Sequence, residues 1–289
     1  MIFMAWFALA TPASATPHRI ISLAPSITEI VYALGAGERM VAKTRYCKYP
    51  LRSKELPDVG GITDPSPEAI LSFQPDLVLI SDLTPVAAYE QLKNLGLNVL
   101  PITGKGIEGI HENIETIAKA LGNKRAGKAL SLSIRRKLEE VKKRCKDCST
   151  KTPPKVLMLI GTNSYFCAGQ DSFSGQIINL IGGKNIAPES KQNWPQVSME
   201  YILAQNPDII IVSLAHEKDE LKAAWKQKKR WQNHPVWKQV PAVKDNRVYF
   251  LKNNMLTIPG PRITSAASIL AQHIHGNKRP AAARRDPNK

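Results

Sequence analysis

The sequence has few of the features that would point to catalysis or to a membrane-embedded protein. Its 289 residues include only four cysteines, and aromatic residues make up 6% of the chain. No phosphate-binding glycine loop, Ser/His/Asp order or metal-ligand signature occurs, so the motifs of the common enzyme classes are missing. After the first 15 residues, no apolar run is long enough to span a bilayer. These absences disfavour both an enzyme and an integral membrane protein.

The four cysteines do not form a metal-binding pattern. Cys145 and Cys148 make a single CxxC, whereas a zinc ribbon needs a second such pair. A thioredoxin-like site would place the motif at a strand-to-helix turn, but here it ends a long charged helix. We interpret Cys145 and Cys148 as a local disulfide or two exposed thiols, and we expect no metal. Cys47 and Cys167 complete the set, and the sequence leaves the pairing open.

Acidic residues are in short supply, with 24 Asp and Glu against 40 Lys and Arg, and the formal net charge is +16. The excess gathers in two stretches, residues 123–151 and the tail 276–289. A basic, solvated helix and a loose tail account for these stretches. No aromatic platform or base-reading motif accompanies the charge, so we do not expect nucleic-acid binding.

The first 15 residues resemble a secretory signal. About ten apolar residues lead to Ala13-Ser14-Ala15, a small-x-small cleavage site. We expect cleavage near Ala15 and export of the mature protein to the periplasm. A buried N-terminal strand is the alternative interpretation of the same residues.

Strands and helices alternate along the rest of the chain, which is typical of βα units with parallel sheets. Continuous apolar strands indicate sheets that are covered on both faces. Expected strands are 19–25, 39–44, 75–81, 97–102, 155–161, 207–213 and 247–252; expected helices are 26–37, 67–73, 84–96, 173–183, 199–205 and 260–274.

One unit occurs twice: "SPEAILSFQPDLVLIS" at 66–81 and "SMEYILAQNPDIIIVS" at 198–213. Between the two copies, one long helix from about 121 to 145 carries apolar residues at helical spacing (Ala126, Leu130, Ile134, Leu138 and Val141). The sequence therefore predicts an α/β protein with two Rossmann-like lobes, 18–120 and 154–275. A bridging helix at 121–148 joins them, and the ligand cleft lies between them.

Serines begin several of the expected helices. Ser26 followed by Glu29 has the spacing of a capping box, and Gly35 ends that helix. Ser66 and Ser198 cap the two repeated helices. Glu68 and Glu200, at the second helical position of each, complement the positive end of the helix dipole.

Four segments, taken together and in this order, carry a family resemblance: "RIISLAPSITEIVYALGAGERMVAKTRYCKYP", "LPDVGGITDPSPEAILSFQPDLVLIS", "NWPQVSMEYILAQNPDIIIVS" and "PGPRI". Over residues 18–275 the chain resembles the periplasmic substrate-binding proteins of metal-chelate ABC importers, and within them the cobalamin-binding branch. The resemblance implies a helix-bridged receptor with little hinge motion. Such a receptor is a monomer and not an enzyme, needs no cofactor, and delivers its ligand to an ABC permease dimer with ATPase subunits.

The resemblance also implies where the ligand lies. By position, the contacts of cobalamin fall on a Tyr after the second strand, a Trp before "PQVS" and a loop ahead of "PRI". A corrin is a large plate with apolar edges and amide arms, which suits aromatic rings and a side-chain amide. The chain departs from the cobalamin receptors at Ile62, where they carry a second aromatic residue. The residues so identified are Tyr46, Trp194, Asn254, Met255, Leu256, Thr257 and Ile258.

In the same family, glutamates equivalent to Glu68 and Glu200 face the membrane and meet arginines on the permease. A pair of carboxylates related by pseudo-symmetry suits a two-fold symmetric partner. Helix capping alone is the other explanation.

Two other functions stay open at this point. In the first, the ligand is haem or a ferric siderophore, and Tyr46 is an axial oxygen ligand. In the second, the chain is a thiol redox protein that uses Cys145 and Cys148 in their basic surroundings.

Overall fold

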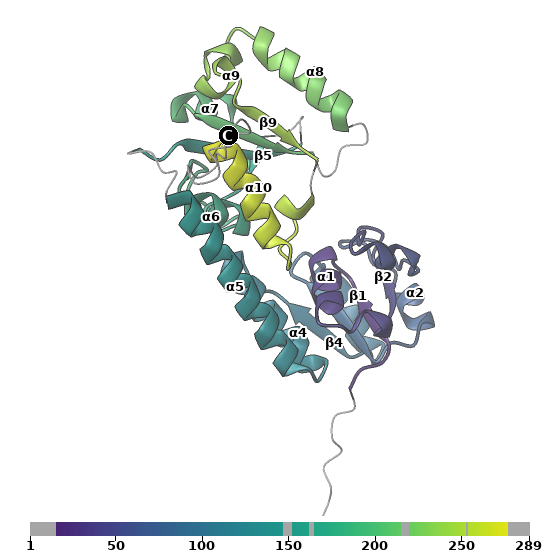
Figure 1. Cartoon of the computed structure of the whole chain (residues 1–289). Coiled ribbons are helices and arrows are strands. Elements are labelled where there is room, and N and C mark those ends of the chain that lie inside the picture. The colour runs from purple at the N-terminus through teal and green to yellow at the C-terminus, as the bar shows by residue number, and fades with distance from the viewer. Residues whose placement is uncertain (1–15, 147–151, 162–164, 215–219, 253, 277–289) are drawn as a thin grey trace, which may run out of the picture.

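The computed structural model describes residues 16–146, 152–161, 165–214, 220–252 and 254–276. The expected signal at 1–15, Cys148 and all but the first residue of the basic tail lie outside these ranges. Two sheets, one from each half of the chain, lie at opposite ends of an elongated molecule, and α5 (Lys124–Lys146) runs along one flank between them (Figure 1).

The N-terminal lobe is built on a four-stranded parallel sheet in the order β2-β1-β3-β4. Every residue of β1 and four of the five residues of β3 are buried, as expected for strands with helices on both faces. The elements of this lobe are β1 (Ile20–Ser22), α1 (Pro25–Ala33), β2 (Met40–Lys43), α2 (Pro67–Ser72), β3 (Leu77–Ser81), α3 (Val86–Asn94) and β4 (Val99–Ile102), with short 3-10 helices at Gly37–Arg39 and Leu51–Glu55.

The C-terminal lobe is built on a five-stranded sheet in the order β6-β5-β8-β9, with β7 also paired to β5. Only β6 is antiparallel to its neighbour. The elements of the C-terminal lobe are β5 (Lys155–Ile160), β6 (Phe166–Cys167), α6 (Phe173–Leu180), β7 (Lys184–Asn185), α7 (Met199–Gln205), β8 (Ile209–Ser213), α8 (Glu220–Asn233), α9 (Pro241–Lys244), β9 (Val248–Leu251) and α10 (Ile263–His275), with 3-10 helices at Trp237–Gln239 and Asn254–Leu256. The parallel α/β fold class predicted from the sequence is confirmed.

Two long helices were not predicted from the sequence. The first is α4 (Gly106–Ala120), whose Ile110, Ile114 and Ile117 are buried at helical spacing, a signal that the sequence does contain. The second is α8. The short strands β6 and β7, two residues each, carry no periodic signal of their own.

Helix α4 packs along the bridging helix α5, so the helix that joins the lobes is supported by a second helix and is not an isolated rod. Gly122 takes a left-handed backbone conformation, with φ of +73°, and so separates α4 from α5. The bridging helix therefore starts at Lys124, three residues after the expected start at 121. Ile134, Leu138 and Val141 are buried as the helical stripe predicts, while Ala126 and Leu130 are half-buried against the same core.

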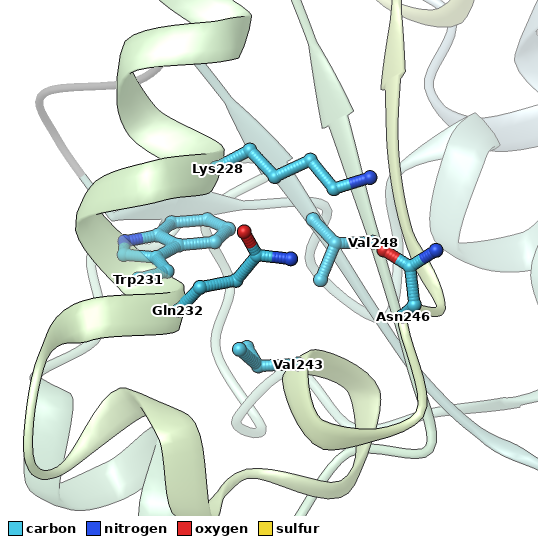
Figure 2. A pocket seen from close by; sticks show the side chains of 6 residues that line it. All are labelled: Lys228, Trp231, Gln232, Val243, Asn246 and Val248. Atoms are coloured by element: carbon cyan, nitrogen blue, oxygen red, sulfur yellow. The ribbon is translucent and has the colours of Figure 1, made fainter.

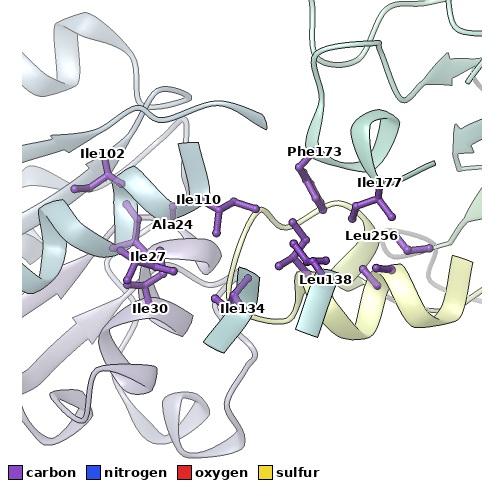
Figure 3. Close-up of a cluster of buried hydrophobic side chains, with 14 of the residues drawn as sticks. Ala24, Ile27, Ile30, Ile102, Ile110, Ile134, Leu138, Phe173, Ile177 and Leu256 are labelled. Atoms are coloured by element: carbon purple, nitrogen blue, oxygen red, sulfur yellow. The ribbon is translucent and has the colours of Figure 1, made fainter. Parts of the chain in front are cut away.

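The hydrophobic core does not stop at the boundary between the lobes. One cluster of buried side chains continues from Ile27 and Ile30 of α1 through Ile110 and Ile134 to residues of the C-terminal lobe (Figure 3). Phe173 and Ile177 of α6 and the fully buried Leu256 stand at its far end. Close packing of this kind resists changes in the angle between the lobes, because any such change would open voids.

The predicted capping box at Ser26 is wrong. Helix α1 begins at Pro25, its N-cap position is Ala24, and no side chain caps it. Proline suits the first helical position because its missing N–H would have had no intrahelical partner there. Ser26 is thus inside the helix, and the Glu29 side chain accepts hydrogen bonds from Arg262 in place of the backbone of its own helix. Gly35, with φ of +77°, lies just beyond the end of α1, as predicted.

Candidate functional site

Tyr46 lies in the loop that follows β2, at the carboxyl end of a parallel strand. Its side chain is 45% exposed, and the Arg45 guanidinium lies 5.1 Å from the ring centroid. Arg45 also pairs with Asp64, and its backbone N–H donates to Gly60 O at 3.0 Å. The loop that carries Tyr46 is therefore fixed against the neighbouring loop at 60–64.

Gly61 lies against the Arg45–Asp64 pair. A Cβ at Gly61 would lie 2.1 Å from Asp64 Oδ1 and 2.7 Å from an Arg45 nitrogen. A larger residue would displace these two side chains, so the glycine at position 61 leaves room for the Arg45–Asp64 pair.

Tyr49 is a second aromatic residue on the same loop, and it was not among the residues predicted for the site. It is 45% exposed, and the Arg262 guanidinium lies 4.2 Å from the centroid of its ring. Arg262 belongs to the C-terminal lobe and directly precedes α10. The sequence signal that could have identified it is a second tyrosine in the same loop, three positions after Tyr46.

The predicted stretch 254–258 forms a tight turn in the C-terminal lobe. The Asn254 carbonyl accepts from Thr257 N and Ile258 N at 3.0 and 3.1 Å. Leu256 is fully buried in the core, and its carbonyl accepts a hydrogen bond from Ser174 Oγ at 2.6 Å. The Leu256 side chain is therefore not accessible to a ligand, whereas Asn254, Met255, Thr257 and Ile258 are partly exposed.

Arg262 joins the turn at 254–258 to the N-terminal lobe. Its Nη1 donates to Asn254 Oδ1 at 3.1 Å, its Nε donates to Glu29 Oε2 at 2.9 Å, and its Nη2 donates to Glu29 Oε1. The Arg262 side chain is 16% exposed and the Glu29 side chain 2%. Burial raises the pKa of the Glu29 carboxyl, and the hydrogen bonds and charge of Arg262 act in the opposite direction.

Trp194 lies in the loop before α7 and is half-buried against the main core. Backbone hydrogen bonds tie this loop to the β6 region, from Cys167 N to Pro195 O and from Gly169 N to Asn193 O, both at 2.9 Å. In the part of the chain that the structure describes, neither a hydrogen bond nor a ring contact joins Trp194 to Tyr46. The structure thus links Tyr49 to the turn at 254–258 through Arg262, and it places Trp194 and Met255 against the same hydrophobic core.

Two surface hollows lie away from these residues. One of about 10 Å³, the size of a single water, is lined by Lys228, Trp231, Gln232, Val243, Asn246 and Val248 of the α8 region (Figure 2). The other, of about 290 Å³, is lined by Glu115, Thr116, Lys119, Lys124 and Lys128 beside the turn from α4 to α5. The first is far too small for a large organic ligand, and the second is lined by charged and polar side chains and not by the apolar walls typical of such a site.

Glu68 and Glu200 occupy equivalent, exposed places in the first turns of α2 and α7. The predicted caps are confirmed, because Ser66 Oγ accepts from Ala69 N at 3.3 Å and Ser198 Oγ accepts from Tyr201 N at 3.1 Å. Hydrogen bonds from its own backbone N–H and from Ser198 lower the pKa of Glu200. The serine caps leave both carboxylates exposed to solvent.

The cysteines do not form an accessible thiol centre in the described ranges. Cys47 and Cys167 are buried and in no disulfide, and burial raises the pKa of Cys167 to about 11. Cys145 is buried on the inner face of α5, whereas a redox-active cysteine needs solvent access. The same ranges contain no group of three or more His, Cys, Asp or Glu suited to a metal ion. They also contain no helix with the length and apolar character of a membrane span.

Comparison with known sequences gives a family match over most of the chain. A family described as periplasmic binding protein matches residues 20–255. An uncharacterized ABC transporter substrate-binding lipoprotein of Bacillus subtilis is 31% identical over 264 residues, which cover 90% of this chain and 80% of that protein. A vitamin B12-binding protein of Pectobacterium atrosepticum is 29% identical over 279 residues, covering 94% of this chain and 95% of that one.

Solved structures of two ligand classes resemble the chain to a similar degree. A periplasmic heme-binding protein in complex with two hemes has a TM-score of 0.78 and 27% identity, with 89% of this chain and 97% of that one covered. The periplasmic vitamin B12-binding protein of Vibrio cholerae has a TM-score of 0.75 and 27% identity, with 90% and 97% covered. The chain belongs to the periplasmic binding protein family, the substrate-binding receptors of ABC importers, and is not an enzyme.

Proposed function

We propose that this receptor binds a corrinoid such as cobalamin between its two lobes. Tyr46 and Trp194 contribute aromatic walls, and Asn254 with its neighbours Met255, Thr257 and Ile258 contributes the opposite edge. One observation carries the proposal: the loop with two half-exposed tyrosines and the turn at 254–258 come from different lobes and belong to one contact network through Arg262.

The chemistry of these groups suits a corrinoid. Tyrosine and tryptophan rings bury large area at low entropic cost, which fits the faces and apolar edges of a planar macrocycle. The Asn254 amide can pair with the amide arms of a corrin. The vitamin B12-binding relatives, 29% identical in the case above, support the same ligand.

Delivery follows from the paired glutamates. In this proposal, the receptor works in the periplasm, and each lobe presents one exposed carboxylate, Glu68 or Glu200, to one subunit of an ABC permease dimer. Arginines on the permease are the natural partners, because they bind carboxylates with two parallel hydrogen bonds. The ATPase subunits act behind the permease.

Calorimetry with cyanocobalamin and with haemin, each added to the purified protein, tests the ligand class. We expect 1:1 binding of cyanocobalamin and weaker or no binding of haemin. Binding of haemin alone would overturn the corrinoid assignment. Native mass spectrometry of protein purified from its own cell provides an independent check, since it detects the molecule that copurifies.

Haem is the second candidate, and the solved haem-bound structure with 27% identity and a TM-score of 0.78 favours it. The half-exposed Tyr46 would then be an axial oxygen ligand to iron. Absorption spectra separate the two cases, because a tyrosine–iron bond changes the Soret region. Tyr46→Phe would abolish that change if Tyr46 is the ligand.

A further inference from the structure

We infer that Arg262 is a positioning residue that locks the two lobes together and holds Tyr49 as an aromatic platform of the ligand site. The inference rests on the proposed function for the ligand class, but the lock itself is a property of the protein without ligand. Three groups from three segments converge on the guanidinium: the carboxylate of Glu29, the amide of Asn254 and the ring of Tyr49.

The first part of the inference is the lock. Glu29 is on α1 of the N-terminal lobe and Arg262 precedes α10 of the C-terminal lobe, 233 positions apart in the sequence. The Nε and Nη2 of Arg262 address the two carboxylate oxygens, the bidentate geometry that makes Arg–carboxylate pairs strong and directional. Because Glu29 is 2% exposed, removal of Arg262 would leave a buried carboxylate without its cation.

The second part concerns the close approach of the Gly260 backbone to the Glu29 side chain. A Cβ placed on Gly260 would lie 3.1 Å from Glu29 Oε2, so the segment before α10 reaches the carboxylate at contact distance. A displacement of either lobe would break the hydrogen bonds and the contact together. This pair is thus a polar counterpart to the apolar core that runs between the lobes.

The third part concerns Tyr49. A guanidinium over an aromatic ring is an attractive, oriented contact, and Arg262 holds the ring at 4.2 Å while the side chain stays 45% exposed. The same guanidinium donates to Asn254 Oδ1, which orients that amide so that its NH₂ group points away from Arg262. Arg262 therefore fixes one aromatic face and one polar donor without being the wall of the site itself.

Lysine could not do the same. An ammonium has no plane to stack on a ring and no fork to match a carboxylate, so it can hold Glu29 or Tyr49 but not both in this geometry. The variants that test the inference are Arg262→Gln, Arg262→Lys, Glu29→Gln, the double Glu29→Gln/Arg262→Gln, and Tyr49→Ala. Arg135→Gln is the matched control, because it removes an exposed Arg–Glu pair between α4 and α5, away from the site.

Two measurements without ligand test the lock. In Arg262→Gln, we expect faster hydrogen exchange both in α1 and in residues 254–262, and faster oxidation of Tyr49 in hydroxyl-radical footprinting. Tyr46, equally exposed but beside Arg45, is the internal reference. The double variant should exchange no faster than Arg262→Gln alone. Unchanged exchange and unchanged Tyr49 oxidation in Arg262→Gln would overturn the lock.

Ligand binding tests the platform, with cyanocobalamin and haemin as the probes. For the probe that the parent protein binds, Tyr49→Ala and Arg262→Gln should each weaken affinity about 30-fold, the scale of an aromatic hot spot. Arg262→Lys should fall between these and the parent, and Arg135→Gln should match the parent. Full affinity in Arg262→Lys or in Tyr49→Ala would contradict the positioning role.

Failure of the proposed function and failure of the Arg262 inference give different results. If the parent binds neither probe, the proposed ligand class is wrong, while exchange and footprinting still decide whether Arg262 locks the lobes and covers Tyr49. If the parent binds a probe and Arg262→Gln binds it as tightly, the function stands and this inference is wrong. Should Arg262→Gln fail to fold, Arg262→Lys and Tyr49→Ala give the same decision.

Discussion

The side-chain oxygen of Gln176 accepts a hydrogen bond of 2.7 Å from the backbone N–H of Ile107. Ile107 is in the first turn of α4, and Gln176 is on α6 of the C-terminal lobe. Gly106, with φ of +64°, permits the contact, because a Cβ there would lie 2.7 Å from the Gln176 amide. This bond and the Arg262–Glu29 pair join the halves of the molecule at two separate places.

We therefore expect ligand binding to change the angle between the lobes very little. In the described residues, a core that continues between the lobes and two cross-links oppose hinge motion, in contrast to receptors that close around a ligand. Small-angle scattering of the empty and the loaded protein should give nearly the same radius of gyration. A clear decrease on loading would contradict this expectation.

Replacement of Trp194 by alanine should weaken corrinoid binding by about 2 kcal/mol or more, the scale of a buried aromatic contact at a binding site. The Trp194 loop is held by backbone hydrogen bonds that do not involve the indole, so the loop should keep its course. Calorimetry measures the effect. Trp225→Ala is the control, since Trp225 is 61% exposed on α8, and an equal affinity for both variants would show that Trp194 is not a wall of the site.

Glu68→Gln and Glu200→Gln should each weaken docking to the permease, and the double variant should weaken it further. Glutamine keeps the size of the side chain, and Ser66 and Ser198 still cap the helices, so the fold should be unaffected. Ligand affinity should also be unchanged. The measurement is binding of the loaded receptor to reconstituted permease at low salt. If the double variant binds the permease as tightly as the parent does, the glutamates have no docking role and act only as charges at the helix ends.

Cys47 and Cys167 should resist alkylation in the folded protein. Burial raises the pKa of both thiols, to about 11 for Cys167, and the thiolate is the reactive form. Iodoacetamide at pH 8 should therefore leave both unmodified until the chain is unfolded in urea, as peptide mass spectrometry can show. Rapid modification of Cys167 at pH 8 without urea would mean that the β6 region opens.

His111 should make stability depend on pH. It is 2% exposed between α4 and α5, with Nδ1 2.8 Å from Ser131 Oγ, and burial, aided by the charge of Arg135, lowers its pKa from 6.5. The folded protein thus binds this proton less tightly than the unfolded chain does. The contribution of the buried, neutral His111 to the free energy of unfolding is therefore complete above pH 6.5 and declines as the pH falls below 6.5.

Urea unfolding at pH 7.5 and pH 5.5 measures this dependence. The parent should lose more stability on acidification than His111→Gln, which has no proton to gain. His18→Gln, at an exposed position, should behave like the parent. Equal losses in the parent and His111→Gln would assign the acid sensitivity to other groups.

Local patterns in the sequence determined much of the fold. The apolar runs predicted the seven longer strands, because buried parallel strands need continuous apolar residues. Ser66 and Ser198 predicted their own caps, since the cap and the N–H that it accepts from are three residues apart. The stripe Ile134, Leu138 and Val141 predicted the inner face of α5 for the same reason: a helix brings positions three and four apart onto one side.

What only the tertiary structure decided involves residues that are far apart in the chain. The sequence assigned Glu29 to a capping box, but the helix begins at Pro25 and the carboxylate turns to Arg262, 233 positions later. The contact of the Tyr49 ring with Arg262 and the burial of Leu256 depend on the same segment before α10. A buried charge takes the partner that the packed lobes bring within hydrogen-bond reach, and that partner has no fixed spacing from it in the sequence, so no local pattern could have predicted it.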